Sequence, residues 1–230
     1  MEDIMNIYDI LGPVMVGPSS SHTAGAVRIG LVTRKLLGAQ PKSAQIRLAG
    51  SFAATGKGHG TDRALAAGLL GMQPDDSRIP ESLTLAKEQG MDVTFGDISL
   101  KDAHPNTALL HVVGTNGREL EIQASSLGGG RIMINKIDGI DVNVTGEKPT
   151  LIVHNLDQPG HVAEVTSMLS HKAVNIASMQ LYRNKRGGYA VMVLETDQPI
   201  PQECMEWLEH HVEGIIKVTY LDPAQEEEET

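Results

Sequence analysis

The stretch VNVTGEKPTLIV, residues 142–153, decides the fold because it separates two halves with different patterns. Gly146 to Pro149 place turn-forming and charged residues between two β-branched runs, which is typical of a linker. With 230 residues and 40% hydrophobic content, the chain can build a core on each side of it. The pattern therefore predicts a linker near residues 143–148, domains at residues 1–143 and 149–222, and an acidic tail at residues 223–230.

Downstream of the linker, strands and helices are expected in the order βαββαβ. The expected strands are residues 150–155, 175–182, 189–195 and 214–221, and the expected helices are residues 160–171 and 201–211. The two middle strands are joined by NKRGG, whose glycines suit a hairpin. This order is the ferredoxin-like split βαβ arrangement, a four-stranded antiparallel sheet with both helices on one face.

The upstream half predicts a mixed sheet with helices, so the fold class of the chain is α/β in the broad sense, α+β. A hairpin is expected over residues 109–124 around Asn116-Gly117, a dipeptide that suits a type I′ turn. The other expected elements are helices at residues 21–37, 62–70 and 82–89, and strands at residues 44–49, 91–95 and 131–139.

Charge and cysteine content exclude several classes of function. Nineteen Lys and Arg against 29 Asp and Glu give a net charge of −10, which argues against nucleic acid or an anionic membrane as the main partner. No apolar run reaches the roughly 20 residues of a membrane span, and acidic residues stand where a signal peptide has a basic flank, so a cytoplasmic protein is expected. One cysteine, Cys204, excludes a metal cluster built from several thiolates of this chain alone.

The stretch GPSSSHT, residues 17–23, is the first candidate site. A helix cap needs one side chain, but this stretch supplies three serines together with His22 and Thr23. The N–H groups and partial positive charge of a helix N-terminus suit a small carboxylate. The same positive end disfavours an imidazolium, and a neutral imidazole is what a general base requires. The alternative is a flexible serine-rich cap beside an exposed histidine.

A second stretch, SFAATGKGHGTDRAL, predicts a strand that ends at Ser51, a glycine-rich turn and a new helix. In the turn, Lys57 offers an ammonium group to a substrate carboxylate, and His59 is a second titratable group between glycines that permit close approach. Asp62 can cap the helix or orient an imidazole. The spacing fits neither a phosphate loop nor a dinucleotide-binding motif.

Three weaker stretches could form walls of a site. HPNT (residues 104–107) and SSLGGGRI (residues 125–132) are a turn and a glycine run, which could equally serve tight corners alone. NLDQPGH, residues 155–161, could bind a small amino acid at a helix start, or could be only a good turn. Cys204 lies within an expected helix, where a buried apolar role is expected rather than a reactive thiol.

The order of these motifs resembles a known family. IYDILGPVMVGPSSSHTAGAVRIG, GSFAATGKGHGTDRAL, HPNT and SLGGG look like the β chain of the two-subunit bacterial iron–sulfur-dependent L-serine dehydratase, over residues 1 to about 142. NLDQPGHVAEVTSMLS and VNIASMQ resemble an ACT domain, a βαββαβ regulatory module that often pairs and binds amino acids. The first half is also similar to the allosteric substrate-binding domain of some phosphoglycerate dehydrogenases.

The resemblance implies a reaction and its partners. L-serine would lose water and ammonia to give pyruvate without pyridoxal phosphate, and a [4Fe-4S] cluster on a separate α chain would act as Lewis acid on the leaving hydroxyl. The implied partners are that α chain, L-serine, and a second copy of this chain paired through the ACT domain. The β chain by itself should be inactive, because the active site would lie between chains.

The resemblance also implies roles for individual residues, with no metal ligand among them. His22 and His59 are the implied catalytic residues, and which of them handles the α-proton stays open. The implied substrate-binding residues are Ser20, Ser21, Thr23, Lys57, Thr61 and Asp62. A weaker set for a regulatory ligand is Asn155, Asp157, Gly160, Asn175 and Ile176. Two other roles stay open: a regulatory amino-acid-binding subunit without catalytic residues, and a structural partner whose loops only dock the α chain.

Overall fold

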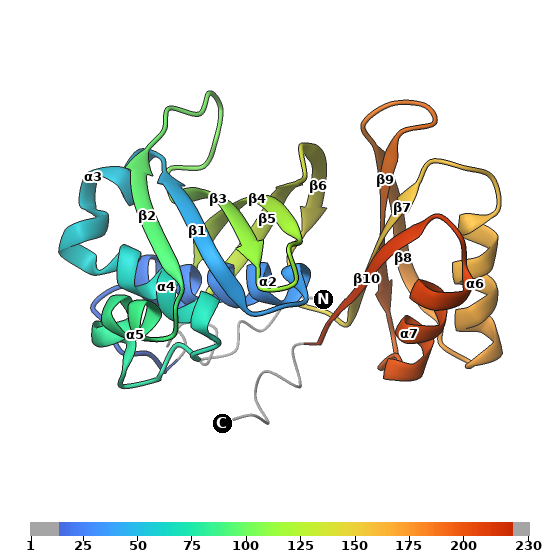
Figure 1. The fold of residues 1–230 in the computed structure, drawn as a ribbon, viewed down its shortest axis with the longest axis horizontal. Coiled ribbons are helices and arrows are strands. Elements are labelled where there is room, and N and C mark those ends of the chain that lie inside the picture. Colours follow the sequence, from blue (N-terminus) through green and yellow to red (C-terminus); the bar gives the residue numbers. More distant parts are fainter. Residues whose placement is uncertain (1–13, 223–230) are drawn as a thin grey trace, which may run out of the picture. The chain divides into compact units, whose positions relative to one another are not determined.

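The computed structural model describes residues 14–222, except for the side chain of Lys57 (Figure 1). The acidic tail and all of the IYDILGP stretch, residues 7–13, therefore lie outside the described residues. The chain divides into two compact units, Met1–Asp138 and Gly139–Thr230, and both combine helices with strands. This confirms the predicted α+β fold class. The expected linker at residues 143–148 falls inside the second unit.

The first unit contains a mixed sheet with the strand order β2-β1-β3-β4-β5. Strands β1 and β2 are parallel, whereas the other neighbouring pairs are antiparallel. The elements are the π-helix η1 (Ser20–Gly25), α2 (Ala26–Leu37), β1 (Pro41–Leu48), α3 (Gly50–His59), α4 (Thr61–Leu70), the 3₁₀ turn η2 (Ile79–Glu81), α5 (Ser82–Glu88), β2 (Asp92–Asp97), β3 (Thr107–Gly114), β4 (Glu119–Gly128) and β5 (Arg131–Ile137).

Two glycines bring the helices of this unit close together. An added Cβ at Gly30 of α2 would lie 2.5 Å from the carbonyl oxygen of Leu65, and one at Gly68 of α4 would overlap that of Val27. Helices α2 and α4 therefore pack backbone to backbone on the sheet (Figure 1). Because η1 leads directly into α2 and α3 leads into α4, this packing positions the two segments that carry the predicted histidines.

Most predicted elements of the first unit are confirmed. The predicted helix at residues 21–37 is present, but its first turn is a π-helix, a form that is frequent at functional sites. Gly38 and Gly71 close α2 and α4 in the left-handed conformation, as expected. The β3–β4 hairpin is present, but only Gly117 of its Asn116-Gly117 pair has a positive φ, so the turn is not type I′.

The prediction for the SFAATGKGHG stretch was wrong. Strand β1 ends at Leu48, and the residues predicted as a glycine-rich turn form helix α3. The backbone N–H groups of Ser51 and Phe52 donate to the carbonyl oxygen of Pro105 at 2.7 and 3.3 Å, and the Phe52 side chain is fully buried. This contact with a distant loop anchors the start of α3 and outweighs the low helix propensity of its glycines.

The second unit has the predicted βαββαβ order after a short first strand. Its elements are β6 (Ile140–Val144), β7 (Thr150–Leu156), α6 (His161–His171), β8 (Ile176–Arg183), β9 (Tyr189–Thr196), α7 (Gln202–His211) and β10 (Ile215–Leu221). The sheet order is β10-β7-β9-β8, all antiparallel. Figure 1 shows α6 and α7 on one face of this sheet, where Leu151, Val165 and Leu208 share one core. Among the described residues, no helix is long and apolar enough to cross a membrane.

Candidate functional site

His22 is a buried histidine whose two ring nitrogens face hydroxyl groups. It lies in η1 and is 8% exposed. The Oγ of Ser19 caps the helix by accepting the backbone N–H of His22 at 3.3 Å and lies 3.4 Å from Nδ1. On the other side of the ring, the hydroxyl oxygens of Thr55 and Ser51 in α3 lie 3.0 and 3.4 Å from Nε2. The imidazole is thus held between two helices.

The second predicted histidine lies beside the first. The ring centroids of His22 and His59 are 5.0 Å apart, and Phe52 packs against His22 in an edge-to-face arrangement at 5.1 Å. His59 is exposed because it is the last residue of α3, before the left-handed Gly60. The site therefore pairs one buried imidazole with one that solvent reaches.

Burial is the largest cause that lowers the pKa of His22. A hydrogen bond with the backbone of Ser51 raises this pKa, and the nearby His59 lowers it. The direction agrees with the predicted neutral imidazole. The main cause of the lower pKa is that burial removes solvent from the ring. The sequence pattern had instead indicated the positive end of the helix as the cause.

The glycine run SLGGG lies against η1. The Oγ of Ser20 accepts the backbone N–H of Gly129 at 3.3 Å, and an added Cβ at Gly25 would overlap the hydroxyl of Ser126. Arg28 donates to the carbonyl oxygen of Gly130 at 3.2 Å. The end of β4 and the loop that follows it therefore form one wall of the candidate site.

The HPNT turn joins the other three stretches at the same place. Pro105 accepts the N–H groups at the start of α3, and the carbonyl oxygen of Asn106 accepts the backbone N–H of Ser126 at 2.9 Å. The His104 Nδ1 accepts the N–H of Asn106 at 3.1 Å, within the turn itself. All four motifs, spread from residue 17 to residue 132 of the sequence, thus meet around η1 and α3.

Three buried hydroxyl oxygens of this unit have no hydrogen-bond partner among the described residues: Thr23 Oγ1, Thr61 Oγ1 and Ser126 Oγ. Buried polar groups normally have partners, so such groups mark positions where water or a ligand can bind. Thr23 and Ser126 lie at η1, where Thr23 packs against Gly17 and Ser126 against Gly25.

The other predicted substrate-binding residues differ in position. Ser21 lies over Gly128, with its Oγ 3.6 Å from the place of an added Cβ. Thr61 packs beside Gly56 at the start of α4. Asp62 accepts the N–H of Arg63, and no hydrogen bond between the described residues joins Thr61 or Asp62 to His22. Lys57 lies in α3 rather than in a loop, and its side chain is outside the described part of the chain.

Sequence reasoning missed Thr55 as a site residue. Ser51 and Thr55 are four residues apart, so on a helix they lie on one face and can contact the same ring. That signal was present in the sequence, but the stretch was interpreted as strand and turn, in which this spacing has no such meaning.

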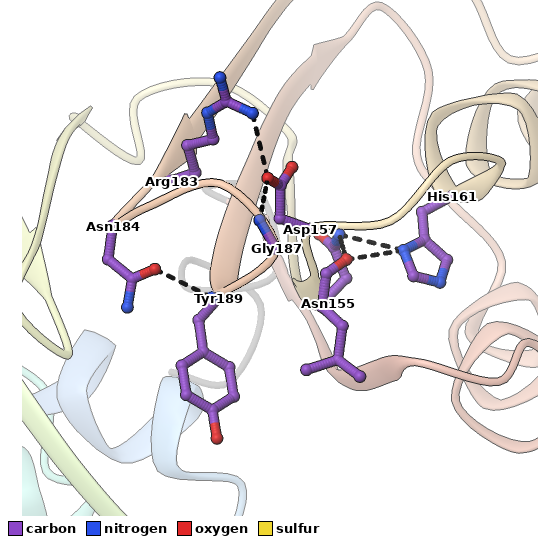
Figure 2. A network of polar contacts seen from close by, with 8 residues as sticks. Asn155, Asp157, His161, Arg183, Asn184, Gly187 and Tyr189 are labelled. Atoms are coloured by element: carbon purple, nitrogen blue, oxygen red, sulfur yellow. Dashed lines mark hydrogen bonds and ion pairs between the residues drawn. The ribbon is translucent and has the colours of Figure 1, made fainter.

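In the second unit, the end of β7 and the loop that follows it hold three of the five residues predicted to bind a regulatory ligand. The Asp157 carboxylate accepts the N–H of Gly187 at 2.9 Å and a guanidinium N–H of Arg183 at 3.0 Å (Figure 2). The hydrogen bond from Gly187 is the largest cause that lowers the pKa of Asp157. Asn155 donates to the carbonyl oxygen of Leu156 at 2.6 Å.

Asn175 and Ile176 lie elsewhere in the second unit. They border a hollow of about 400 Å³ lined also by residues of α6, among them Thr166 and Ser170. Asn175 donates to Asp197 at 2.6 Å. Gly160, in contrast, precedes α6 with a φ of 104°. Within one chain, the described structure therefore does not bring all five residues to one place.

His161, the first residue of α6, is a buried histidine that was not predicted as a site residue. His161 is 5% exposed, and its Nδ1 and Nε2 lie 2.8 and 2.9 Å from the carbonyl oxygens of Leu156 and Glu213. Figure 2 shows its ring beside Asn155, whose Nδ2 is 3.3 Å from Nδ1. Among the described residues of the whole chain, no three His, Cys, Asp or Glu side chains form a group that could hold a metal ion.

These features define an α+β protein in which one unit carries a histidine and hydroxyl site at a helix start and the other is a βαββαβ unit. Residues 6–88 match the family described as "Serine dehydratase beta chain". The chain is 40% identical over 216 residues to "Probable L-serine dehydratase, beta chain" of Bacillus subtilis (strain 168), covering 94% of this chain and 97% of that protein. The chain therefore belongs to the serine dehydratase beta chain family, which confirms the resemblance to the β chain of an L-serine dehydratase.

Two further relatives extend the comparison. "L-serine dehydratase, beta chain" of Peptoniphilus asaccharolyticus is 40% identical over 196 residues, which are 85% of this chain and 88% of that protein. "D-3-phosphoglycerate dehydrogenase" of Synechocystis sp. is 35% identical over 117 residues, which are 50% of this chain but 21% of the dehydrogenase. Part of this chain thus has a counterpart inside a protein that is named for a different activity.

Proposed function

We propose that this chain is the β subunit of an L-serine dehydratase, which converts L-serine to pyruvate and ammonia together with a separate α subunit. The single observation that carries the proposal is the 40% identity to the "Probable L-serine dehydratase, beta chain" of Bacillus subtilis over 94% of this chain. The gathering of all four motif stretches around His22 supports it, because catalytic groups must be close together to act on one small substrate.

His22 or His59 removes the α-proton of serine in this proposal. His22 supplies a neutral imidazole because burial lowers its pKa, and a neutral ring nitrogen can accept the proton as the Cα–H bond breaks. His59 has the more accessible ring. The 5.0 Å between the two centroids supports a role for both, one as base and the other in binding the substrate or in proton transfer.

The substrate carboxylate would bind at the start of η1. Free N–H groups at a helix N-terminus favour an anion, and the hydroxyls of Ser20, Ser21 and Thr23 surround that end of the helix. The unpartnered oxygen of Thr23 supports this role, since a bound ligand or water would satisfy it. We assign Lys57, Thr61 and Asp62 to the edge of the same site, on the resemblance alone.

A [4Fe-4S] cluster on the α subunit would supply the Lewis acid for the leaving hydroxyl. The residues of this chain do not fit such a cluster, because its single cysteine, Cys204, is buried in α7 and cannot provide several thiolates. The contribution of this chain is therefore to bind serine and to move protons. The cytoplasmic location expected from the sequence stays part of the proposal.

The second unit would be an ACT domain that pairs two copies of this chain and binds a regulatory ligand. The βαββαβ order and the sheet order β10-β7-β9-β8 support that assignment. In a pair, residues from two chains could complete a ligand site that one chain holds only in part. This would reconcile the separation of Asn155, Asp157 and Gly160 from Asn175 and Ile176.

A regulatory subunit without catalytic residues is the second candidate. The match to a D-3-phosphoglycerate dehydrogenase favours it, because a segment shared with an enzyme of another reaction can serve binding in both. This alternative predicts that the chain binds L-serine without the α subunit and that no residue of this chain is required for turnover.

The test mixes the purified chain with its anaerobically reconstituted α partner and measures pyruvate formation from L-serine, with each chain alone as a control. We expect activity only when both chains are present. An α chain that is active by itself would favour the regulatory candidate. His22→Asn and His59→Asn should each lower the rate by roughly 100-fold or more, the usual contribution of general acid–base catalysis, while copurification with the α chain is unchanged. Full activity in both variants would exclude the catalytic role.

A further inference from the structure

The hydroxyl of Thr55 makes two hydrogen bonds with different requirements. Its Oγ1 lies 2.9 Å from the carbonyl oxygen of Ser51, one turn earlier in α3, and 3.0 Å from the Nε2 of His22. A carbonyl oxygen can only accept, so the single hydrogen of the Thr55 hydroxyl is donated to Ser51. Toward Nε2, Thr55 then has only lone pairs to offer. The short contact to His22 is therefore a hydrogen bond in which Nε2–H is the donor.

The other ring nitrogen, Nδ1, has the complementary arrangement. The Oγ of Ser19 already accepts the backbone N–H of His22, and its own O–H remains available toward Nδ1 at 3.4 Å. A neutral imidazole carries one N–H and one lone pair, so a hydrogen on Nε2 leaves the lone pair on Nδ1. Burial favours this neutral form of His22. The donors and acceptors around both ring nitrogens thus favour the same tautomer, with the hydrogen on Nε2.

We propose that Thr55 is a positioning residue that holds His22 in its Nε2–H tautomer and makes Nδ1, on the Ser19 side, the basic atom. A proton taken up by His22 forms its new bond at Nδ1 and leaves the Thr55 hydrogen bond intact. The assignment of the tautomer does not depend on the proposed function. Its consequence for catalysis does rest on that function.

Ser51 provides a matched comparison because it offers a hydroxyl to the same nitrogen from a greater distance. Its Oγ lies 3.4 Å from Nε2, compared with 3.0 Å for Thr55, and 3.5 Å from the Thr55 hydroxyl. If the tautomer depends on the shorter bond, Ser51→Ala should leave it unchanged. Thr55→Val removes the hydroxyl and keeps the shape of the side chain, whereas Thr55→Ser keeps the hydroxyl.

The first experiment measures long-range ¹H–¹⁵N correlations of the full-length chain labelled with ¹⁵N in its histidines, which distinguish Nε2–H from Nδ1–H by the ¹⁵N shifts. The signals of His22 among the nine histidines are those lost in His22→Asn. The wild-type chain, Thr55→Ser and Ser51→Ala should show the Nε2–H tautomer, and Thr55→Val should show a mixture of both tautomers. An Nδ1–H tautomer in the wild-type chain would overturn the proposal. This measurement does not depend on whether any variant folds. An unchanged tautomer in folded Thr55→Val would also overturn it.

The second experiment assays the same variants with the α chain. Thr55→Val should lower kcat by at least about tenfold with a smaller change in KM, because Nδ1, the proposed basic atom, then carries a hydrogen part of the time. Thr55→Ser should restore kcat. A wild-type mixture without activity would count against the proposed function and leave the tautomer result standing. A changed tautomer with unchanged kcat would overturn the catalytic role of Thr55 alone.

Discussion

His22 in the first unit and His161 in the second are both buried, at 8% and 5% exposure, but their partners differ in kind. Ser19, Ser51 and Thr55 present hydroxyls to His22. His161 instead meets backbone carbonyl oxygens at both ring nitrogens. Hydroxyls can donate or accept and can follow a change in protonation, whereas carbonyls only accept. The chemistry of the partners, rather than burial, separates a histidine suited to proton transfer from one suited to holding loops together.

The position of His161 in the chain supports that structural role. Its two carbonyl partners are Leu156, the last residue of β7, and Glu213, which lies between α7 and β10 and is 52 residues along the chain from His161. Gly214 lies directly against the ring. His161 therefore ties the end of β7 to the loop between α7 and β10.

The largest expected stability effect comes from replacing His161 with asparagine. His161→Asn should lower the free energy of unfolding of the second unit by about 2–4 kcal/mol, because the buried ring loses its contacts with the carbonyl oxygens of Leu156 and Glu213. The fluorescence of Trp207, the single tryptophan of the chain and a residue of α7, can follow urea unfolding of this unit. His22→Asn is the control and should move this transition by less than about 0.5 kcal/mol. Equal shifts in both variants would contradict the comparison.

A smaller effect is expected from Gly214→Ala. The new Cβ would lie 2.7 Å from Cε1 and Nε2 of His161, and Gly214 has a φ of 90°, so the variant adds a clash to backbone strain. Gly187→Ala is a matched control, because that glycine has a φ of 70° but no atom within 4 Å of the added Cβ. Gly214→Ala should be less stable than the control by about 1–3 kcal/mol in the Trp207 transition. Equal stabilities of the two variants would show that the His161 ring can move away from the new Cβ.

The smallest expected effect is the dependence of the stability of the first unit on pH. Because burial lowers the pKa of His22 in the folded chain, the unfolded chain binds more protons between the folded and unfolded pKa values. The stability of the first unit should therefore rise with pH in this window, and decline as pH falls below about 6.5 toward the folded pKa.

Hydrogen exchange of peptides from residues 14–138 can measure this dependence, since Trp207 lies outside the first unit. His22→Asn lacks the titrating ring, so its first unit should lose less protection than the wild type between about pH 7.5 and pH 5.5. Identical pH profiles of the two chains would show that His22 does not contribute.

Much of the fold followed from local sequence signals. The βαββαβ order rests on alternating apolar residues separated by turn formers, and Gly38 and Gly71 mark where α2 and α4 end. The family followed from the order of four motifs. Helix α3 could not be predicted in this way, because its start depends on Pro105, more than 50 positions along the chain from Ser51. With α3 misread as a turn, Thr55 was missed as well.

The sequence by itself determined the elements whose signals lie within a few residues, the presence of a histidine and three serines at one helix start, and the membership of the family. Only the tertiary structure decided which hydroxyls face His22, since Thr55 is 33 residues away from it in the chain. That contact depends on the close approach of α2 and α4 through Gly30 and Gly68, which is a property of packing between distant segments. Local patterns specify what each segment can form, and packing selects which side chains meet.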